Sequence, residues 1–458
     1  MWMMDEKNFV INIIKIANAM ELKLKIARWF LYLAILLLPW QMRWFSSGPI
    51  IGGYPWEQGS LSIYLSWLPM MIVIMVAMID AVGARFPRPV PGSLPPGSQD
   101  QGRVTLPLPI IAVILFLLPF IFSVYPRASF QWLVEILLLI LFFISLQTLH
   151  VSRFMIMRWF AISLIPHALL GLWQFHTQNV FGSKWLGMAT QNPLTAGVSV
   201  IEYAGQRILR AYGGFPHPNI FGGWLAIALP VTLLLVQHAK RSIAKFAWMI
   251  CGVLFSVALV LTFSRSAWIT AGVGLMFVAL LFLRRQESWT NKIPACAGMT
   301  VIFIALALTT FHERALIAPR VDATVRLEQK SLDERAVGWR NGWQLFRQHP
   351  FFGVGPGATA HALNSQLIPH NVPLLALDEL GIVGMIGLLS IVYWIFCIQY
   401  KKYSILNTSY SILCALLILS LFDHYLWSLW SGRVLLILTL FLFWSIYPPY
   451  GGIDSWEK

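Results

Sequence analysis

Apolar runs of about twenty residues, the length of helix that crosses the hydrocarbon core of a bilayer, recur along most of this 458-residue chain. Backbone polar groups inside lipid must find partners within their own segment, so such runs favour helices over an open sheet. Only 11% of the residues are charged, whereas soluble proteins carry roughly 25%. The sequence therefore predicts an all-α membrane protein.

The runs predict about twelve transmembrane helices in one domain over residues 1–458. Nine spans fall within 28–312, a large loop covers 313–371, and three more spans fall within 372–447. The ninth and eleventh runs are short. The expected spans are 28–46, 61–83, 104–124, 128–150, 155–175, 216–237, 244–263, 266–283, 299–312, 372–397, 409–423 and 431–447.

Lys and Arg gather in every second connection, as Arg153 and Arg158 or Lys240 and Arg241 do. Cytoplasmic loops carry such an excess, so we expect both termini in the cytoplasm and the 313–371 loop on the outer face of the membrane. The net charge of +14 is dispersed among these loops. It does not form the single basic face of a nucleic-acid-binding protein, so no nucleic-acid partner is expected.

The large loop contains an amphipathic pattern. A capping-box sequence at Ser331–Glu334 predicts a helix start, and Pro350 predicts its end. An Arg-rich polar face accompanies an apolar face made by Leu332, Ala336, Trp339, Trp343 and Phe346. Such a helix suits the outer surface of the membrane, although it would also suit packing on the tops of other helices.

Arg210 precedes the sixth span in a turn-rich stretch that ends with His217, Pro218 and Asn219. A helix start offers free backbone N–H groups to an anion, and an adjacent arginine would strengthen that site. We therefore consider Arg210, His217 and Asn219 candidate binding residues. The alternatives are that Arg210 reaches lipid phosphate and that His217 is a structural cap.

Arg265 lies at the centre of an apolar stretch that runs from residue 246 to residue 283. As one helix this stretch would be about 57 Å long, nearly twice the roughly 30 Å of the hydrocarbon core. It must therefore be a hairpin, with Arg265 at a very tight outer turn. A charge so close to lipid indicates binding of a phosphate or carboxylate.

His370 ends the large loop, followed by Asn371 and by Pro373 in the first turn of the next helix. A histidine at that boundary suits a general base, although a lone histidine is more often structural. Glu379 follows about two turns later and could neutralise an arginine inside the bundle. Asp423, His424 and Arg433 form a separate polar cluster, for which an ion pair is the simpler interpretation.

Several chemistries are absent from the sequence. There is no Walker A loop for an ATP-driven pump. There is also no HExxH motif and no paired His/Cys spacing for zinc. The four cysteines lie in spans or in an inner loop, so no disulfide is expected. We expect neither a metal nor a cofactor.

Five motifs from about Arg210 to Gly432 resemble those of the bacterial O-antigen ligase and O-antigen polymerase superfamily, in the same order. They are RAYGGFPHPNIFGGWLA, LTFSRSAWITAG, ERAVGWRNGWQLFRQHPFFGVGPG, PHNVPLLALDELGIVG and FDHYLWSLWSGRVLL. The resemblance implies a metal-independent, inverting glycosyltransferase with a GT-C-like helix bundle. Its donor would be a glycan on undecaprenyl pyrophosphate, and its acceptor the lipid A core or another glycan, on the periplasmic side.

The resemblance also implies roles for individual residues. Arg210 and Arg265 match the arginines thought to hold the pyrophosphate, and His370 matches the proposed activating base. Arg335 matches a frequent arginine of the large loop. These motifs do not separate a ligase from a polymerase. A secondary transporter or lipid flippase is the alternative from another class, but the charges gather at outer helix ends rather than at the midplane of paired repeats.

Overall fold

The computed structural model describes residues 6–56, 59–84, 107–284, 289–322, 326–402 and 409–444, and it is mostly helical. The helices are α1 (Glu6–Leu37), α2 (Trp67–Ala84), α3 (Pro107–Ile121), α4 (Pro126–Thr148), α5 (Arg153–Thr177), α6 (Pro218–His238), α7 (Ser242–Leu261), α8 (Arg265–Arg284), α9 (Trp289–His312), α10 (Arg314–Asp322), α11 (Arg326–Gln348), α12 (Thr359–Ala362), α13 (Val372–Lys402), α14 (Ser409–Phe422), α15 (Tyr425–Ser428) and α16 (Trp430–Trp444).

Five of the described helices are long and apolar enough to cross a membrane, or six if Cys296–His312 and Arg314–Arg320, bent by 82°, count as one span. Five further apolar helices are shorter. The predicted number of about twelve spans is therefore not confirmed. Helix α14 shows why: its 14 residues give about 21 Å, short of a core of roughly 30 Å.

The bounds of helix α1 differ from those of the predicted first span, 28–46. Helix α1 begins at Glu6 and ends at Leu37, so it includes the lysine-containing segment that precedes the span. Pro39 follows directly, and the chain then enters strand β1 (Arg43–Phe45), which pairs antiparallel with β4 (Ser62–Tyr64). Lysine is a good helix former, so the basic residues do not interrupt α1.

Helix α6 is the centre of the bundle. Nearly all its residues are buried, and it contacts α5, α7, α8, α9, α14 and α16. At its start a side chain on Gly223 would meet Tyr425 Oη at 1.7 Å, so only glycine allows this approach. The first turn of α6 is thereby fixed against the corner between α14 and α15.

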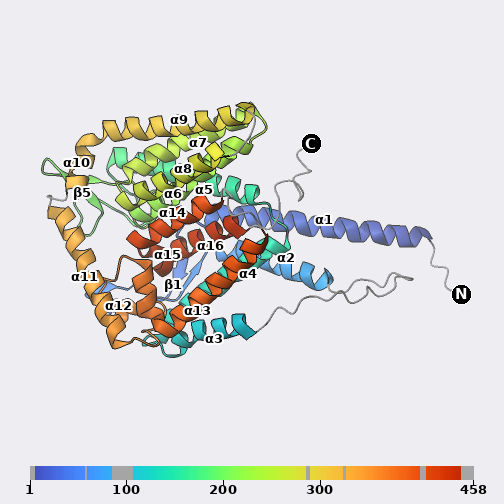
Figure 1. Cartoon of the computed structure of the whole chain (residues 1–458), viewed down its shortest axis with the longest axis horizontal. Coiled ribbons are helices and arrows are strands. Elements are labelled where there is room, and N and C mark those ends of the chain that lie inside the picture. The colour runs from blue at the N-terminus through green and yellow to red at the C-terminus, as the bar shows by residue number, and fades with distance from the viewer. Residues whose placement is uncertain are drawn as a thin grey trace.

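Helices α7 and α8 form the tight hairpin expected around Arg265. Only Thr262, Phe263 and Ser264 separate the two helices. Phe263 has a left-handed φ of +48°, a conformation that non-glycine residues adopt mainly in turns and constrained sites. The turn lies at the same end of the bundle as α10, α11 and α12, which we call the loop end. Figure 1 shows α10 and α11 across this end, with α1 extending from the opposite one.

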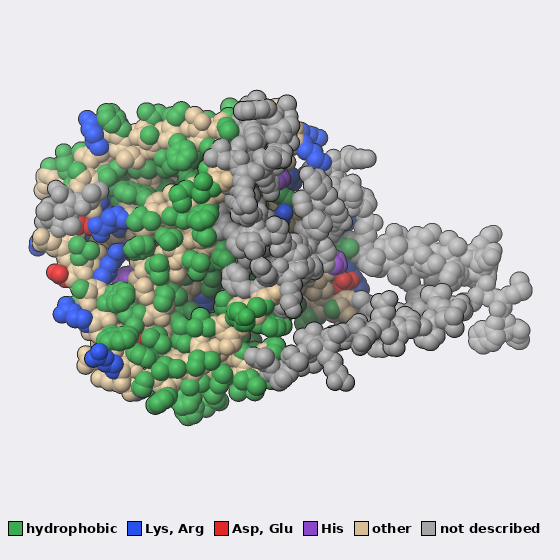
Figure 2. Space-filling view, in the orientation of Figure 1, with side chains coloured by type: hydrophobic (Ala, Val, Ile, Leu, Met, Phe, Trp, Pro, Cys, Tyr) green, Lys and Arg blue, Asp and Glu red, His purple; other side chains and the backbone are tan. Residues whose placement is uncertain are grey.

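Arginine and lysine side chains are visible along the margin of the loop end in Figure 2, whereas most side chains on the helices beside it are hydrophobic. The connection from α5 to α6 also lies at this end. It contains the antiparallel hairpin of β5 (Val200–Tyr203) and β6 (Gln206–Leu209). A third small pair joins β2 (Ile50–Ile51) and β3 (Tyr54–Pro55). These short hairpins were not predicted.

Helix α11 begins at Arg326, five residues before the predicted capping box, and ends at Gln348 as expected before Pro350. It lies against the end of the large loop and α13 through Gly338 and Gly342, where any side chain would meet Ile368 O or Pro369 Cγ within 2.6 Å. Trp339 and Trp343 are exposed on another face. The helix therefore packs on its neighbours and still presents tryptophans outward, so its place at the membrane surface stays a prediction.

Helix α13 is broken at Gly381, whose φ of 60° and ψ of −172° are not helical. The backbone of Pro350–Gly355, from the large loop, enters the break. Ile382 N–H donates to Pro350 O at 2.8 Å and Val383 N–H to Phe351 O at 3.0 Å, while Val354 N–H donates to Asp378 O at 2.9 Å. This docking fixes the large loop on the apolar helix that follows His370.

Candidate active site

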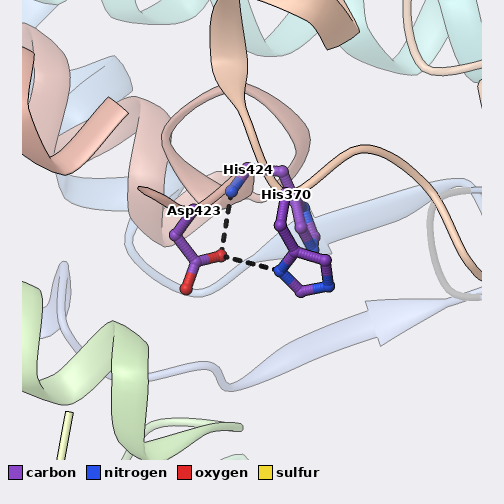
Figure 3. Close-up of side chains that lie close together, drawn as sticks. All are labelled: His370, Asp423 and His424. Carbon is purple, nitrogen blue, oxygen red and sulfur yellow. Dashed lines mark hydrogen bonds and ion pairs between the residues drawn. The ribbon is translucent and has the colours of Figure 1, made fainter. Parts of the chain in front are cut away.

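His370 and Asp423 meet at the loop end although they come from different motifs. His370 Nδ1 lies 3.7 Å from Asp423 Oδ1, an ion-pair distance. The His424 backbone N–H donates to the same oxygen at 2.8 Å, as Figure 3 shows. The side chain of His370 is 34% exposed and that of Asp423 only 6%. A reachable imidazole thus has a buried carboxylate behind it, the usual arrangement of a base and the group that orients it.

Asn219 connects Asp423 to Arg210. Its Nδ2 donates to Asp423 Oδ2 at 3.2 Å, and its Oδ1 accepts from Arg210 Nη2 at 2.7 Å. Arg210, His370 and Asp423 belong to separate motifs that lie far apart in the sequence. The structure joins them into one line of contacts, Arg210–Asn219–Asp423–His370.

Arg210 is buried, and within the described part of the chain its guanidinium donates only to neutral oxygens. Nε donates to Thr262 O at 2.6 Å and Nη1 to Ser199 Oγ at 2.8 Å, in addition to the bond to Asn219. A buried charge without a directly bonded counter-charge is costly. Arg210 is therefore prepared to receive an anion.

His217 is the N-cap of α6, as its structural interpretation predicted. Its Nδ1 accepts from Asn219 N–H at 3.1 Å, and its Nε2 lies 3.3 Å from Ser199 Oγ. The ring holds two neighbours of Arg210 in place. A direct role for His217 in substrate binding stays a prediction.

The electrostatics of this group follow from burial. Burial lowers the pKa of His217 to about 3 and that of His424 to about 4, so both rings are neutral near pH 7. Burial alone would raise the pKa of Asp423, but its contact with His370 and the neighbouring imidazoles hold it below the ordinary value. Burial also lowers the pKa of Arg210, and the charges of Arg320 and Arg335 act in the same direction.

Arg265 does not join the line of contacts from Arg210 to His370. Its Nη1 donates to Arg320 O at 2.8 Å, and its Nη2 lies 3.2 Å from Glu328 Oε2. Arg320 also donates to Glu328. Neither Arg320 nor Glu328 was predicted. In the sequence they are ordinary charges of a polar loop, and only its fold reveals that they are buried.

Arg335 is half-buried on α11, and its positive charge acts on Arg210, Arg320 and His424. Asn371 is the cap of α13: its Oδ1 accepts from Leu374 N–H at 2.9 Å and its Nδ2 donates to Leu421 O at 3.0 Å. Both ends of this amide have protein partners, so a role in substrate binding would require one bond to be exchanged.

Glu379 forms no ion pair with an arginine among the described residues, contrary to expectation. Its carboxylate accepts from Trp427 Nε1 at 2.6 Å and from Thr359 Oγ1 at 3.1 Å, and its side chain is buried. Arg433 likewise does not pair with Asp423. It donates to Glu135 and, at 2.5 Å, to Trp427 O. The ion pair expected in that cluster therefore exists with a different partner, because α4 passes beside α16.

His370, Asp423 and His424 could offer three ligand atoms within 4.8 Å of one another, which is close enough to hold a metal ion. The positive charge of Arg335 nevertheless acts on His424, and His424 Nδ1 is already 2.6 Å from Ser428 Oγ. The positive charge of Arg335 disfavours a metal cation at His424, and one of the three ligand atoms is already engaged. We therefore treat the cluster as an acid–base group.

Part of this site lies in a region that matches a known protein family. A family model described as O-antigen ligase matches residues 250–389, a range that contains Arg265, Arg335 and His370 but not Arg210 or Asp423. No curated protein matches the chain. This match supports the predicted resemblance of the chain to the O-antigen ligase and polymerase superfamily.

Proposed function

We propose that this protein is a membrane glycosyltransferase of the O-antigen ligase type. It would move a glycan from undecaprenyl pyrophosphate to an acceptor hydroxyl, such as one on the lipid A core, at the periplasmic face of the bacterial inner membrane. The observation that carries the proposal is the line of contacts from Arg210 to His370. It places a buried arginine with neutral partners next to an imidazole that solvent can reach.

The chemistry follows from these two groups. An acceptor hydroxyl is a poor nucleophile, and removal of its proton by a positioned base is worth roughly 10²–10⁴-fold in rate. With Nδ1 of His370 directed at Asp423, Nε2 remains for the acceptor proton. The Asp423 carboxylate then stabilises the imidazolium that forms.

The bond changes balance without a cofactor. As the acceptor oxygen bonds to the anomeric carbon, the bond from that carbon to the phosphate oxygen breaks, and both electrons leave with the lipid pyrophosphate. Arg210 and Arg265 would stabilise the growing charge on this leaving group through charge-assisted hydrogen bonds. Direct displacement of this kind inverts the anomeric carbon and requires no metal.

A transfer assay tests the proposal. The purified full-length protein, in lipid nanodiscs, is mixed with an undecaprenyl-pyrophosphate-linked glycan and with lipid A core, in the presence of a chelator. We expect a new lipid A–glycan product and release of undecaprenyl pyrophosphate. Donor movement between leaflets without any new glycosidic bond would instead indicate a transporter or flippase.

The surface glycans of a deletion strain distinguish a ligase from a polymerase. For a ligase, loss of the gene should leave finished polymer on the lipid carrier. For a polymerase, single repeats should remain attached to the acceptor. We expect the first result.

A further inference from the structure

The turn between α7 and α8 holds two arginines by its carbonyl oxygens and carries a third. Arg210 Nε donates to Thr262 O at 2.6 Å. Arg320 donates to the next carbonyl, Phe263 O, from Nε at 3.2 Å and from Nη2 at 3.0 Å. Arg265 begins α8 and donates to the backbone of Arg320. One short turn therefore brings three guanidinium groups to the same place.

Glu328 lies between two of these arginines. Its Oε1 accepts from Arg320 Nη1, and its Oε2 lies 3.2 Å from Arg265 Nη2. The Glu328 side chain is 5% exposed, and its Oε2 has no hydrogen bond within the described part of the chain. The contact to Arg265 is thus a charge contact without hydrogen-bond alignment.

A carboxylate and a phosphate group present similar pairs of oxygen atoms to an arginine, which binds both through its planar fork. One carboxylate carries a single charge, whereas a pyrophosphate diester carries at least two. The charges of Arg210, Arg320 and Arg335 also act on one another. The single negative charge of Glu328 does not balance the positive charges of these arginines. An anion of higher charge should therefore displace the Glu328 carboxylate.

We propose that Arg320 is a third arginine of the pyrophosphate site, and that Glu328 occupies that site until the donor arrives. The proposal rests on the proposed function only for the identity of the donor. Binding of pyrophosphate between Arg265 and Arg320 requires Glu328 to leave, and Glu328 belongs to the first turn of α11. Because Arg335 is on the same helix, donor binding and the placement of Arg335 are coupled.

The test measures binding of inorganic pyrophosphate to the full-length protein in nanodiscs by calorimetry. Removing the competing charge in Glu328→Gln should tighten binding by about tenfold, and removing a donor in Arg320→Gln should weaken it by about tenfold, the scale of one charge-assisted hydrogen bond. Unchanged or weaker binding by a folded Glu328→Gln protein would overturn the competition. Unchanged binding by Arg320→Gln would remove Arg320 from the site.

Glu135→Gln provides a matched control, because Glu135 is an equally buried partner of another arginine, Arg433. Both glutamine variants should lower the temperature of unfolding. Pyrophosphate should restore it for Glu328→Gln and not for Glu135→Gln. Equal behaviour of the two variants would mean that Glu328 is merely structural. If Glu328→Gln does not fold, Glu328→Asp keeps the charge but shortens the reach, and should also tighten binding.

The two proposals fail in different ways. Suppose that the wild-type protein transfers glycan, and that Glu328→Gln and Arg320→Gln bind pyrophosphate as tightly as the wild type does. This result would keep the glycosyltransferase function and refute the roles of Glu328 and Arg320 in the anion site. A protein that shows the expected affinities but transfers no glycan would keep the anion site and refute the transferase function.

Discussion

The Asp423 carboxylate contacts both His370 and Asn219, so one residue serves the base and the arginine network together. If Asp423 acts through His370, replacing both residues should reduce activity no more than replacing His370 alone. This residue was visible in the sequence, but nothing there paired it with His370. Their pairing depends on how the start of α13 and the end of α14 meet at the same corner.

Single and double variants test this expectation. We expect His370→Ala to lose transfer by roughly 10²–10⁴-fold, Asp423→Asn to lose somewhat less, and the double variant to match His370→Ala alone. Donor binding should persist in all three, because Arg210 and Arg265 remain. The exposed Asp333→Asn is the control. Losses that multiply in the double variant would show that Asp423 acts independently of His370.

Buried neutral histidines make the stability of the fold depend on pH. The folded-state pKa values of His217 and His424 are about 3 and 4, below the ordinary 6.5. At pH values between the folded-state pKa and 6.5, these histidines bind protons in the unfolded chain but not in the folded protein. Stability is therefore full above about pH 6.5 and declines as the pH falls towards 4.

Thermal unfolding measured from pH 8 to pH 5 checks this dependence. We expect the unfolding temperature to fall as the pH falls. His424→Gln should reduce the slope of the free energy of unfolding against pH by roughly 1.4 kcal/mol per pH unit, the contribution of about one proton. His176→Gln, at an exposed ring, is the control. A slope that His424→Gln leaves unchanged would contradict the assignment.

At the scale of elements, the sequence predicted the α7–α8 hairpin and the end of α11, because both follow from local rules. It did not predict the break in α13. The residues of α13 read as one continuous apolar run, and Gly381 is a single glycine among several. The break depends on hydrogen bonds to the backbone of Pro350–Gly355, about 30 residues earlier. A pattern within the sequence of α13 alone cannot predict such a partner.

Gly381→Ala should be strongly destabilising. A side chain there would lie 2.4 Å from Phe351 O, and its backbone conformation is essentially restricted to glycine, at a cost on the order of 3 kcal/mol. We expect a large drop in the unfolding temperature in detergent. Gly272→Ala is the matched control: it is in α8 with open space around it, where alanine should be neutral or slightly stabilising. Equal unfolding temperatures for both variants would argue against the docking at Gly381.

At the scale of the whole molecule, hydropathy predicted a mostly helical protein, and its count of about twelve spans stays a prediction, since five or six of the described helices are long and apolar enough to cross a membrane. Alternation of basic connections gave the predicted orientation. Arg210 and Lys240 flank opposite ends of α6, and the orientation in the membrane stays a prediction. Site residues in the large loop could be placed only by resemblance, because their positions depend on how the loop folds back onto the bundle.

Cysteine labelling tests the orientation. On a background without the four native cysteines, Leu194→Cys and Gln344→Cys should react with an impermeant thiol reagent in intact spheroplasts, since both positions are exposed. Lys240→Cys, at the other end of α6, should react only after lysis. Reversed labelling would place the site in the cytoplasm.

The break in α13 also bears on how the protein enters the membrane. Exposed N–H and C=O groups in lipid each cost several kcal/mol, and at Gly381 their partners belong to a loop that is made earlier on the ribosome. In the predicted orientation, the N–H groups of Ile382 and Val383, which begin the second half of α13, therefore have no partners until that loop has been translocated and has turned back. Biogenesis is then ordered: the polar segment must cross first, and the apolar helix that follows it is completed by the segment's return.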